Sequence, residues 1–344
     1  MFCRNLLVLL LILSALTGWS QEAKKKRIEL LNAEVLEYDE ALGHKARRLL
    51  GDVIFEHEGT LMYCDSAYLY EDNSMDAFAN VRINKGDSIK MWCDELNYNG
   101  NTEFAKAKRN VRLEDREMTL TSQKLDYNMA TEKAWYNTGG KIVDSKNTLT
   151  SRVGYYYSAL EEMFFKDSVK LVNKQYTLFC DTLRYNTQTE VAFFLGPTRI
   201  ISDENTILCK FGWYDTEFDI AQFSQKATVY SADQSIEGDS LYYNKRFGYG
   251  LALGNVVVTD TAQDIILTGQ KAKYYEVGDM VLMTDSAVMI QDMGTDSLFL
   301  HADTLLSIVD TVIDRRILFA FHHAKFFKPD MRGKCDSLVY SYAD

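Results

Sequence analysis

The sequence predicts an all-β fold: an elongated array of bent antiparallel strands built from a repeat of about 29 residues. Three observations predict it. A short motif recurs at a constant spacing, apolar and polar residues alternate with the period of a strand, and turn-forming residues occur twice in each repeat. No helical periodicity of any length follows the N-terminal segment.

The recurring motif is clearest in Tyr176–Thr187, YTLFCDTLRYNT. Leu178 and Cys180 share one face of a strand, whereas Leu183 and Tyr185 have the opposite parity. A bulge or a sharp bend is needed to keep all four on one surface. The Cys180 position recurs every 29 residues, with looser copies toward both ends. The regular anchors are residues 64, 93, 122, 151, 180, 209 and 238, and the looser ones are 33, 269, 302 and 335.

The other half of each repeat reads as a second strand, as in Met75–Ile83, where apolar residues alternate. Turn-forming residues in its middle, such as Asn80, Asn110 and Gly254-Asn255, indicate a bend. Each repeat is therefore predicted to be two bent strands joined by tight turns. With about 4.8 Å between strands, repeats lie about 9.6 Å apart and the array extends to roughly 100 Å.

A parallel β-helix with one coil per repeat is the alternative fold. It would bring Cys64 and Cys93 within disulfide reach, whereas the antiparallel array keeps them too far apart. The two turn signals per repeat favour the antiparallel array. Five cysteines occupy the anchor position, where other repeats have Ser, Gly or Ala, so we expect buried free thiols.

The N-terminal residues have the layout of a secretory signal. Arg4 precedes the apolar run Leu6–Leu16, which is too short to span a bilayer, and Gly18–Ser20 forms a small-x-small cleavage site; a retained anchor is the alternative. We expect a signal peptide at 1–20, a basic tail at 21–32 and a continuous array at 33–344, alternatively two stacked units at about 33–240 and 241–344. The mature chain is expected to be exported.

Composition disfavours several functions. The formal net charge of −11 argues against a nucleic-acid partner. The common catalytic, phosphate-binding and zinc-binding motifs are absent from the sequence, so we expect no enzyme activity, no cofactor and no metal site. An aspartate follows many anchors and offers two readings: a calcium or polysaccharide site, or a hydrogen-bond acceptor at the bend. These residues are Asp65, Asp94, Asp181, Asp239, Asp303 and Asp336.

Aliphatic and aromatic residues recur three and five positions after the anchor, and further apolar residues lie in the neighbouring strands. In a folded sheet these side chains line the inside. If no third layer covers them, they form an apolar trough for a lipid chain or a partner. The predicted trough residues are Leu96, Tyr98, Leu125, Tyr127, Val169, Leu171, Leu183, Tyr185, Tyr214 and Tyr243.

The repeat resembles that of the organic-solvent-tolerance A (OstA) proteins, the LptA-type periplasmic domain of lipopolysaccharide transport. The likeness rests on Gly254–Thr284, with its GNV step, its G-x-x-A-x-Y segment and its hairpin spacing. It implies a bent β-jellyroll whose interior holds the acyl chains of lipopolysaccharide. It also implies edge-to-edge strand pairing with other transport components or with itself, in the periplasm and in association with the outer membrane.

The expected function is thus a non-enzymatic lipid-binding bridge or scaffold. The alternatives are a parallel β-helix carbohydrate-active enzyme that uses the aspartates, and an adhesin-like structural rod.

Overall fold

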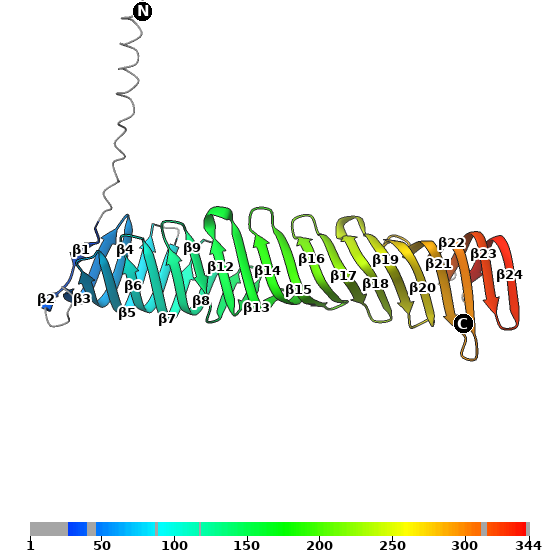
Figure 1. The fold of residues 1–344 in the computed structure, drawn as a ribbon, viewed down its shortest axis with the longest axis horizontal. Coiled ribbons are helices and arrows are strands. Elements are labelled where there is room, and N and C mark those ends of the chain that lie inside the picture. Colours follow the sequence, from blue (N-terminus) through cyan, green and yellow to red (C-terminus); the bar gives the residue numbers. More distant parts are fainter. Residues whose placement is uncertain (1–26, 40–45, 87–88, 117, 311–314, 342–344) are drawn as a thin grey trace, which may run out of the picture.

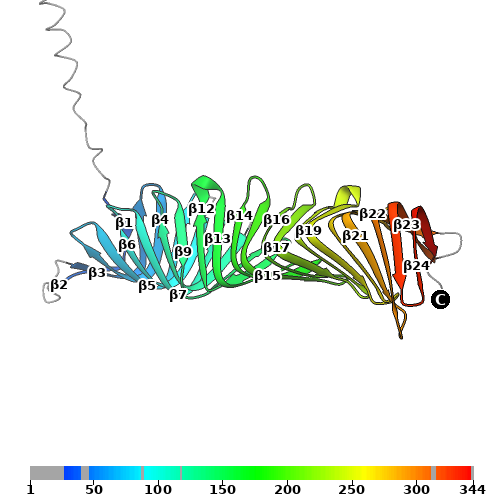
Figure 2. The same ribbon diagram turned by 45° about the vertical axis from the view of Figure 1, so that its right-hand side comes forward.

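The computed structural model describes residues 27–39, 46–86, 89–116, 118–310 and 315–341. They form a long rod in which 24 strands of one sheet run across the long axis (Figures 1 and 2). This confirms the predicted all-β repeat array. The predicted signal peptide and residues 21–26 of the predicted basic tail lie outside the described residues, and the other half of the tail includes β1 (Glu29–Asn32).

The strands follow one another along the rod in chain order. The N-terminal half contains β1 (Glu29–Asn32), β2 (Val35–Asp39), β3 (Ala46–His57), β4 (Thr60–Tyr70), β5 (Ser74–Lys85), β6 (Ile89–Asn99), β7 (Phe104–Glu114), β8 (Met118–Asn128), β9 (Lys133–Tyr136), β10 (Gly140–Asp144), β11 (Thr148–Ser151), β12 (Val153–Tyr157) and the short helix η1 (Ser158–Leu160). The C-terminal half contains β13 (Glu162–Val172), β14 (Tyr176–Asn186), β15 (Val191–Ser202), β16 (Thr206–Asp215), β17 (Ile220–Tyr230), β18 (Gln234–Asn244), the short helix η2 (Lys245–Phe247), β19 (Tyr249–Asp260), β20 (Ile265–Tyr275), β21 (Met280–Asp292), β22 (Ser297–Asp310), β23 (Arg315–Lys328) and β24 (Met331–Ser341).

Every pairing between the described strands is antiparallel, so the alternative of a parallel β-helix is wrong. In the middle of the rod, Leu183 of β14 pairs with Phe165 of β13 on one side and with Phe194 of β15 on the other. β1 and β2 both pair with β3, so together they act as one strand interrupted at the bend. β9 and β10 act in the same way against β8.

The bend has one structural cause along the whole rod. Between the pairs Lys166–Thr182 and Val169–Cys180, β13 advances three residues while β14 advances two. The additional residue is accommodated because Asp167 and Ser168 both adopt positive φ, at 62° and 57°. The predicted bulge is confirmed, but the extra residue belongs to the strand beside the anchor strand.

Most of the odd-numbered strands from β3 to β23 carry positive-φ residues at the same place. Asparagine, aspartate and glycine tolerate this left-handed conformation better than other residues, which is why turn-forming residues in mid-strand marked the bend in the sequence. The non-glycine examples include Asp52, Ala79, Asn80, Arg109, Asn110, Gln225, Lys226, Asn255, Asp285, Ser286, His322 and His323.

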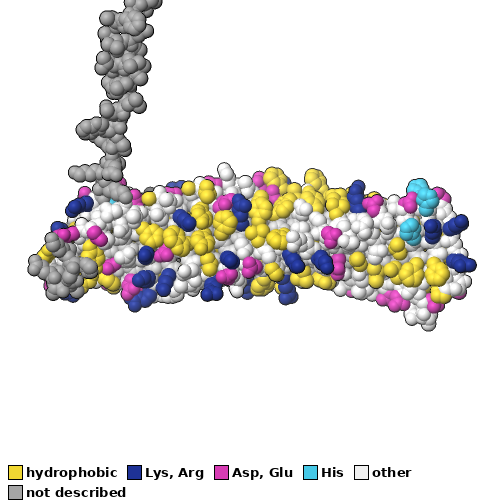
Figure 3. Space-filling view, viewed as in Figure 1, with side chains coloured by type: hydrophobic (Ala, Val, Ile, Leu, Met, Phe, Trp, Pro, Cys, Tyr) yellow, Lys and Arg dark blue, Asp and Glu magenta, His cyan; other side chains and the backbone are white. Residues whose placement is uncertain are grey.

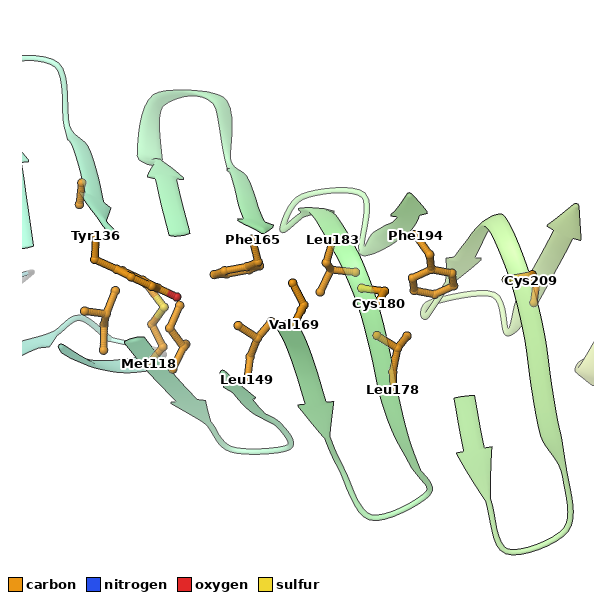
Figure 4. Packing of buried hydrophobic residues seen from close by; sticks show 14 of the residues in the cluster. Met118, Tyr136, Leu149, Phe165, Val169, Leu178, Cys180, Leu183, Phe194 and Cys209 are labelled. Carbon is orange, nitrogen blue, oxygen red and sulfur yellow. The ribbon is translucent and has the colours of Figure 1, made fainter. Parts of the chain in front are cut away.

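The bend folds the sheet into two layers that face each other. Figure 4 shows Tyr136, Phe165, Leu183 and Phe194 projecting from one side of the core, which we call the first layer. Met118, Leu149, Val169 and Leu178 project from the opposite side, the second layer, and Cys180 lies near the bend. One cluster of buried apolar residues runs from Ile28 to Ala324 between the layers.

Candidate functional site: the apolar trough

We call the space between the two layers the trough. Its ten predicted residues occupy two kinds of position. Six are buried, at 4% exposure or less: Leu96, Tyr98, Leu125, Tyr127, Val169 and Leu183. Four are partly exposed: Leu171, Tyr185, Tyr214 and Tyr243. The sequence thus indicates side chains of the interior, but not which of them solvent can reach.

The trough is filled unevenly along the rod. Large side chains of 2% exposure or less lie within residues 49–183 and again from Met283 to Leu318, whereas the large buried side chains between these two regions, such as Phe223 and Leu241, keep a slightly higher exposure of 3–6%. Small residues such as Ala221, Ala227 and Ala252 share the buried interior of β17–β19 with Phe223 and Leu241. Fewer large side chains are therefore fully buried between the layers in the middle of the rod.

In the same region the apolar side chains of the interior are least completely covered by the rest of the protein. We define the open stretch as residues 156–258, where many apolar residues pack against the core yet remain partly exposed. They are Tyr156, Met163, Leu171, Tyr176, Ala192, Ile200, Ile207, Tyr214, Val229, Ile236 and Val258. In the packed stretch before it, comparable positions such as Met75, Met91 and Tyr98 are at most 1% exposed. An apolar chain could add to the core most easily in the open stretch.

Several contacts join the two layers across the mouth of the trough, opposite the bend. In the packed stretch, His57 Nδ1 and the Tyr98 hydroxyl are 2.8 Å apart, and Lys85 Nζ donates to the Met129 carbonyl at 3.0 Å. Near the C-terminal end, the Tyr340 hydroxyl donates to Gln291 Oε1 at 2.5 Å. These polar contacts hold the mouth closed on both sides of the open stretch.

Within the open stretch, the contact across the mouth is apolar. The rings of Tyr176, from the second layer, and Tyr214, from the first, meet edge to face with centroids 6.5 Å apart. An edge-to-face aromatic pair contributes about 0.5–1.5 kcal/mol beyond its buried area. A ligand that offers replacement apolar contact could therefore separate this pair at small cost.

Tyrosines of the first layer alternate with small residues along the mouth. Tyr214 pairs with Ala192 and Ala221, and Tyr243 pairs with Ala221 and Gly250, so each ring lies beside small neighbours. The Tyr214 hydroxyl donates to Asp219 Oδ1 at 2.7 Å. The rings thus belong to the apolar interior while their hydroxyls reach carboxylates at the rim.

Burial changes the ionisation of these phenols. Desolvation raises the pKa of Tyr127 to about 12, with the nearby Glu132 adding to the effect. Desolvation, together with Glu276, also raises the pKa of Tyr243 to about 12. The Tyr127 hydroxyl is buried without a hydrogen-bond partner among the described residues. The tyrosines are neutral at physiological pH and give the trough wall no charge.

Several of the aspartates that follow the anchors make hydrogen bonds at the bend. Asp65, Asp94 and Asp239 each accept a hydrogen bond at 2.8 Å from the side-chain amide of an asparagine at a positive-φ position of the next strand. The donors are Asn80, Asn110 and Asn255. At the same place near the C-terminal end, Asp303 and His323 Nδ1 are 2.8 Å apart, and this hydrogen bond lowers the pKa of Asp303. These four aspartates are therefore hydrogen-bond partners at the bend, as the second reading of the sequence expected, and the groups that they bind are side chains.

The cysteine anchors lie inside the bend as free thiols. Cys64, Cys93, Cys180 and Cys209 are buried, whereas Cys335 in β24 is exposed. Burial raises the pKa of Cys64, Cys93 and Cys180 to about 12. In the described part of the chain, no three His, Cys, Asp or Glu side chains are grouped so that they could hold a metal ion.

Sequence reasoning missed part of the trough wall. Ile200, Ile207, Val229, Ile236 and Val258 line the second layer of the open stretch. The period-2 alternation of their strands was the available signal. No sequence pattern predicts the contacts across the mouth, because they join residues of non-neighbouring strands that meet only after the sheet has folded into two layers.

Three comparisons with known proteins place the chain. A family model described as "OstA-like protein" matches residues 25–181 and 173–239, more than half of the chain. Among solved structures, the chain is similar to LptH, titled the LptA homologous periplasmic component of the conserved lipopolysaccharide transport device from Pseudomonas aeruginosa. The identity is 12% and the TM-score 0.29, over 30% of this chain and 79% of that one. No curated protein sequence matches. None of the described helices has the length and apolar character needed to cross a membrane.

Proposed function

Because the chain belongs to the OstA-like family, we propose that it is a non-enzymatic lipid-binding bridge or scaffold that helps carry lipopolysaccharide through the periplasm to the outer membrane. The observation that supports this most is the open stretch, where apolar side chains between two layers are only partly covered by protein. A long apolar surface of this kind fits an acyl chain.

The cargo would bind by burial of its acyl chains. Each buried methylene contributes about 0.8 kcal/mol, so ten methylenes laid along Leu171, Tyr185 and Ile200 on three successive strands contribute about 8 kcal/mol before the costs of ordering. Separating Tyr176 from Tyr214 costs far less. Sugars and phosphates stay at the mouth, where water and polar rim groups solvate them.

Transfer over a distance requires contact between successive carriers. Among the described strands β24 pairs with β23 alone, and we propose that its other edge takes a further strand. Exposed edges accept further strands, and the two layers of a partner would extend both walls of the trough. We propose edge-to-edge pairing with other transport components or with a second copy, and a trough that is continuous through residues 33–344.

The alternative of a β-helical enzyme requires parallel strands, whereas the described strands are antiparallel. Four of the six aspartates it would use, Asp65, Asp94, Asp239 and Asp303, make hydrogen bonds at the bend. A structural rod that binds no lipid remains distinguishable by experiment.

Site-specific photocrosslinking tests the proposal. Benzoyl-phenylalanine is placed at Tyr185 in the open stretch, at Tyr98 in the packed stretch, or at Phe193 on the outer face, and each variant is irradiated with purified lipopolysaccharide. Tyr185 is expected to give the strongest adduct, and excess free lipid A should suppress it. Absence of an adduct at Tyr185, or equal labelling at Phe193, would leave the chain as a rod without a lipid trough.

A further inference from the structure

A row in which every second residue is basic runs along the outer face of the second layer beside the bend, and three of its other residues are aromatic. Arg82, for example, is exposed between the buried Val81 and Ile83, so it points away from the trough. The register places the members of the row side by side on successive strands. We call this row the outer stripe; in spatial order it contains Tyr63, Arg82, Trp92, Arg112, Thr121, Lys141, Thr150, Lys170, Phe179, Arg199 and Leu208.

The cations of the outer stripe are evenly spaced. They occupy every second strand, so the strand separation sets them about 9.6 Å apart, and five of them extend over about 40 Å. Arg112 pairs with Glu114. The other four have no carboxylate within 4.0 Å among the residues that the structure describes. A straight row of uncompensated positive charge is unexpected in a chain of net charge −11.

Three of the cations lie over aromatic rings of the same stripe. The Arg82 guanidinium carbon is 4.2 Å from the centroid of Tyr63, and that of Arg112 is 5.5 Å from the centroid of Trp92. Lys170 Nζ is 5.6 Å from the centroid of Phe179, which is exposed. Each pair presents a charge and a flat apolar face together.

Two open hollows lie on the outer stripe. One, of about 340 Å³, is lined by Tyr63, Asn80, Arg82, Trp92, Asp94 and Asn110 among others. The other, of about 730 Å³, includes Lys170, Phe179, Pro197, Arg199, Leu208 and Lys210. Both adjoin positive-φ residues of the bend, such as Asn80 and Ser168. In Figure 3 hydrophobic and basic side chains are interspersed along the middle of the face in view.

We propose that the outer stripe binds a linear acidic polysaccharide that lies along the rod, on the side of the sheet away from the trough. The aromatic faces would stack on sugar rings while the cations pair with carboxylate, sulfate or phosphate groups. The hollows beside Trp92 and Phe179 would receive individual sugars.

The geometry favours this ligand over other polyanions. A membrane surface is a plane, whereas the basic residues form a single line along the rod, so few of them could contact a flat layer of headgroups at once. A nucleic-acid strand carries a charge about every 3.4 Å, so it would match only a minority of its phosphates to cations about 9.6 Å apart. A polysaccharide with one acidic group per disaccharide matches the wider spacing.

The test uses hyaluronate, which carries one carboxylate per disaccharide, with neutral dextran as control. Binding to the full chain is measured by tryptophan fluorescence and by affinity electrophoresis at physiological salt. The variant R82Q/K170Q/R199Q is expected to bind at least about tenfold more weakly, since exposed ion pairs are individually weak but three are removed. K106Q/K124Q/K273Q changes the net charge equally on the outer face of the first layer, and should stay within about twofold of the wild type.

Circular dichroism establishes that both variants keep the β-fold, and W92A provides a second test by removing a stacking face without a charge. Failure of hyaluronate to bind more tightly than dextran would overturn the proposal. So would equal loss of binding in both triple variants. Preferential, stripe-dependent binding of a single-stranded DNA oligonucleotide or of phosphatidylglycerol vesicles would reassign the surface to that ligand. Lipopolysaccharide crosslinking at Tyr185 should be unchanged in R82Q/K170Q/R199Q, so the two proposals can fail separately.

Discussion

The division between a packed and an open stretch can be tested by two matched truncations. Leu125 is 1% exposed in the packed stretch, so Leu125→Ala removes fully buried methylenes and leaves a cavity, which costs about 3 kcal/mol. Ile236 is partly exposed in the open stretch, and Ile236→Ala is expected to cost about 1 kcal/mol because the lost burial is smaller. Lipid affinity should respond in the opposite order. Ile236→Ala removes wall area that contacts the acyl chain and should weaken binding about tenfold, whereas Leu125→Ala should leave it unchanged.

Stability is measured by urea unfolding, with hydrogen exchange to assign the loss to a region, because repeat arrays do not unfold as a single cooperative unit. Lipid affinity is measured by displacement of a fluorescent fatty acid. The Leu125→Ala chain serves as the control for a merely destabilised protein. If Leu125→Ala weakens lipid binding as much as Ile236→Ala does, the trough is not divided and the reasoning from partial exposure is wrong.

Three further predictions concern the bend, the interior phenols and the thiols. Asn110→Ala should destabilise the chain by about 2 kcal/mol, because it loses the hydrogen bond to Asp94 and leaves alanine at positive φ; Asn110→Gly should cost about 1 kcal/mol less, as thermal unfolding will show. Tyr127→Phe should stabilise by about 1 kcal/mol, since it removes a buried hydroxyl without a partner among the described residues. Burial raises the pKa of Tyr127 to about 12 in the folded chain, so the free energy gained by keeping this phenol neutral is complete below pH 10 and is lost as the pH rises through 12. Absorbance of the phenolate measures this ionisation, and titration of Tyr127 near pH 10 in the folded chain would contradict the prediction. Iodoacetamide at about pH 8 should label Cys335 and spare Cys180 until urea is added, because a raised pKa leaves little thiolate.

The bend connects the local sequence to the whole shape. At each repeat an additional residue with positive φ turns the strand, and an asparagine at that position is fixed by the aspartate that follows the neighbouring anchor. One recurring local feature therefore places an apolar face inside the fold and a second face outside it. The trough and the outer stripe are the two sides of the same strands.

The alternation of parity around Cys180 was enough to predict where the sheet folds. Side chains in a strand alternate faces with a period of two, so a change of parity among apolar residues leaves only a bulge or a bend. The same reasoning identified Leu96, Leu125 and Leu183 as interior residues. It could not separate these buried positions from Tyr185 and Tyr243, because exposure depends on how far the two layers stand apart.

The sequence by itself determined the repeat, its length, the antiparallel hairpin and the inward face of each strand, since all of these follow from short-range periodicity and turn chemistry. Only the tertiary structure decided which part of the trough is closed. Closure depends on contacts between strands two or more positions apart, such as His57 with Tyr98 and Tyr176 with Tyr214, and on the summed volume of side chains from both layers. The outer stripe also emerged only from the register, which aligns residues about 29 positions apart into a line.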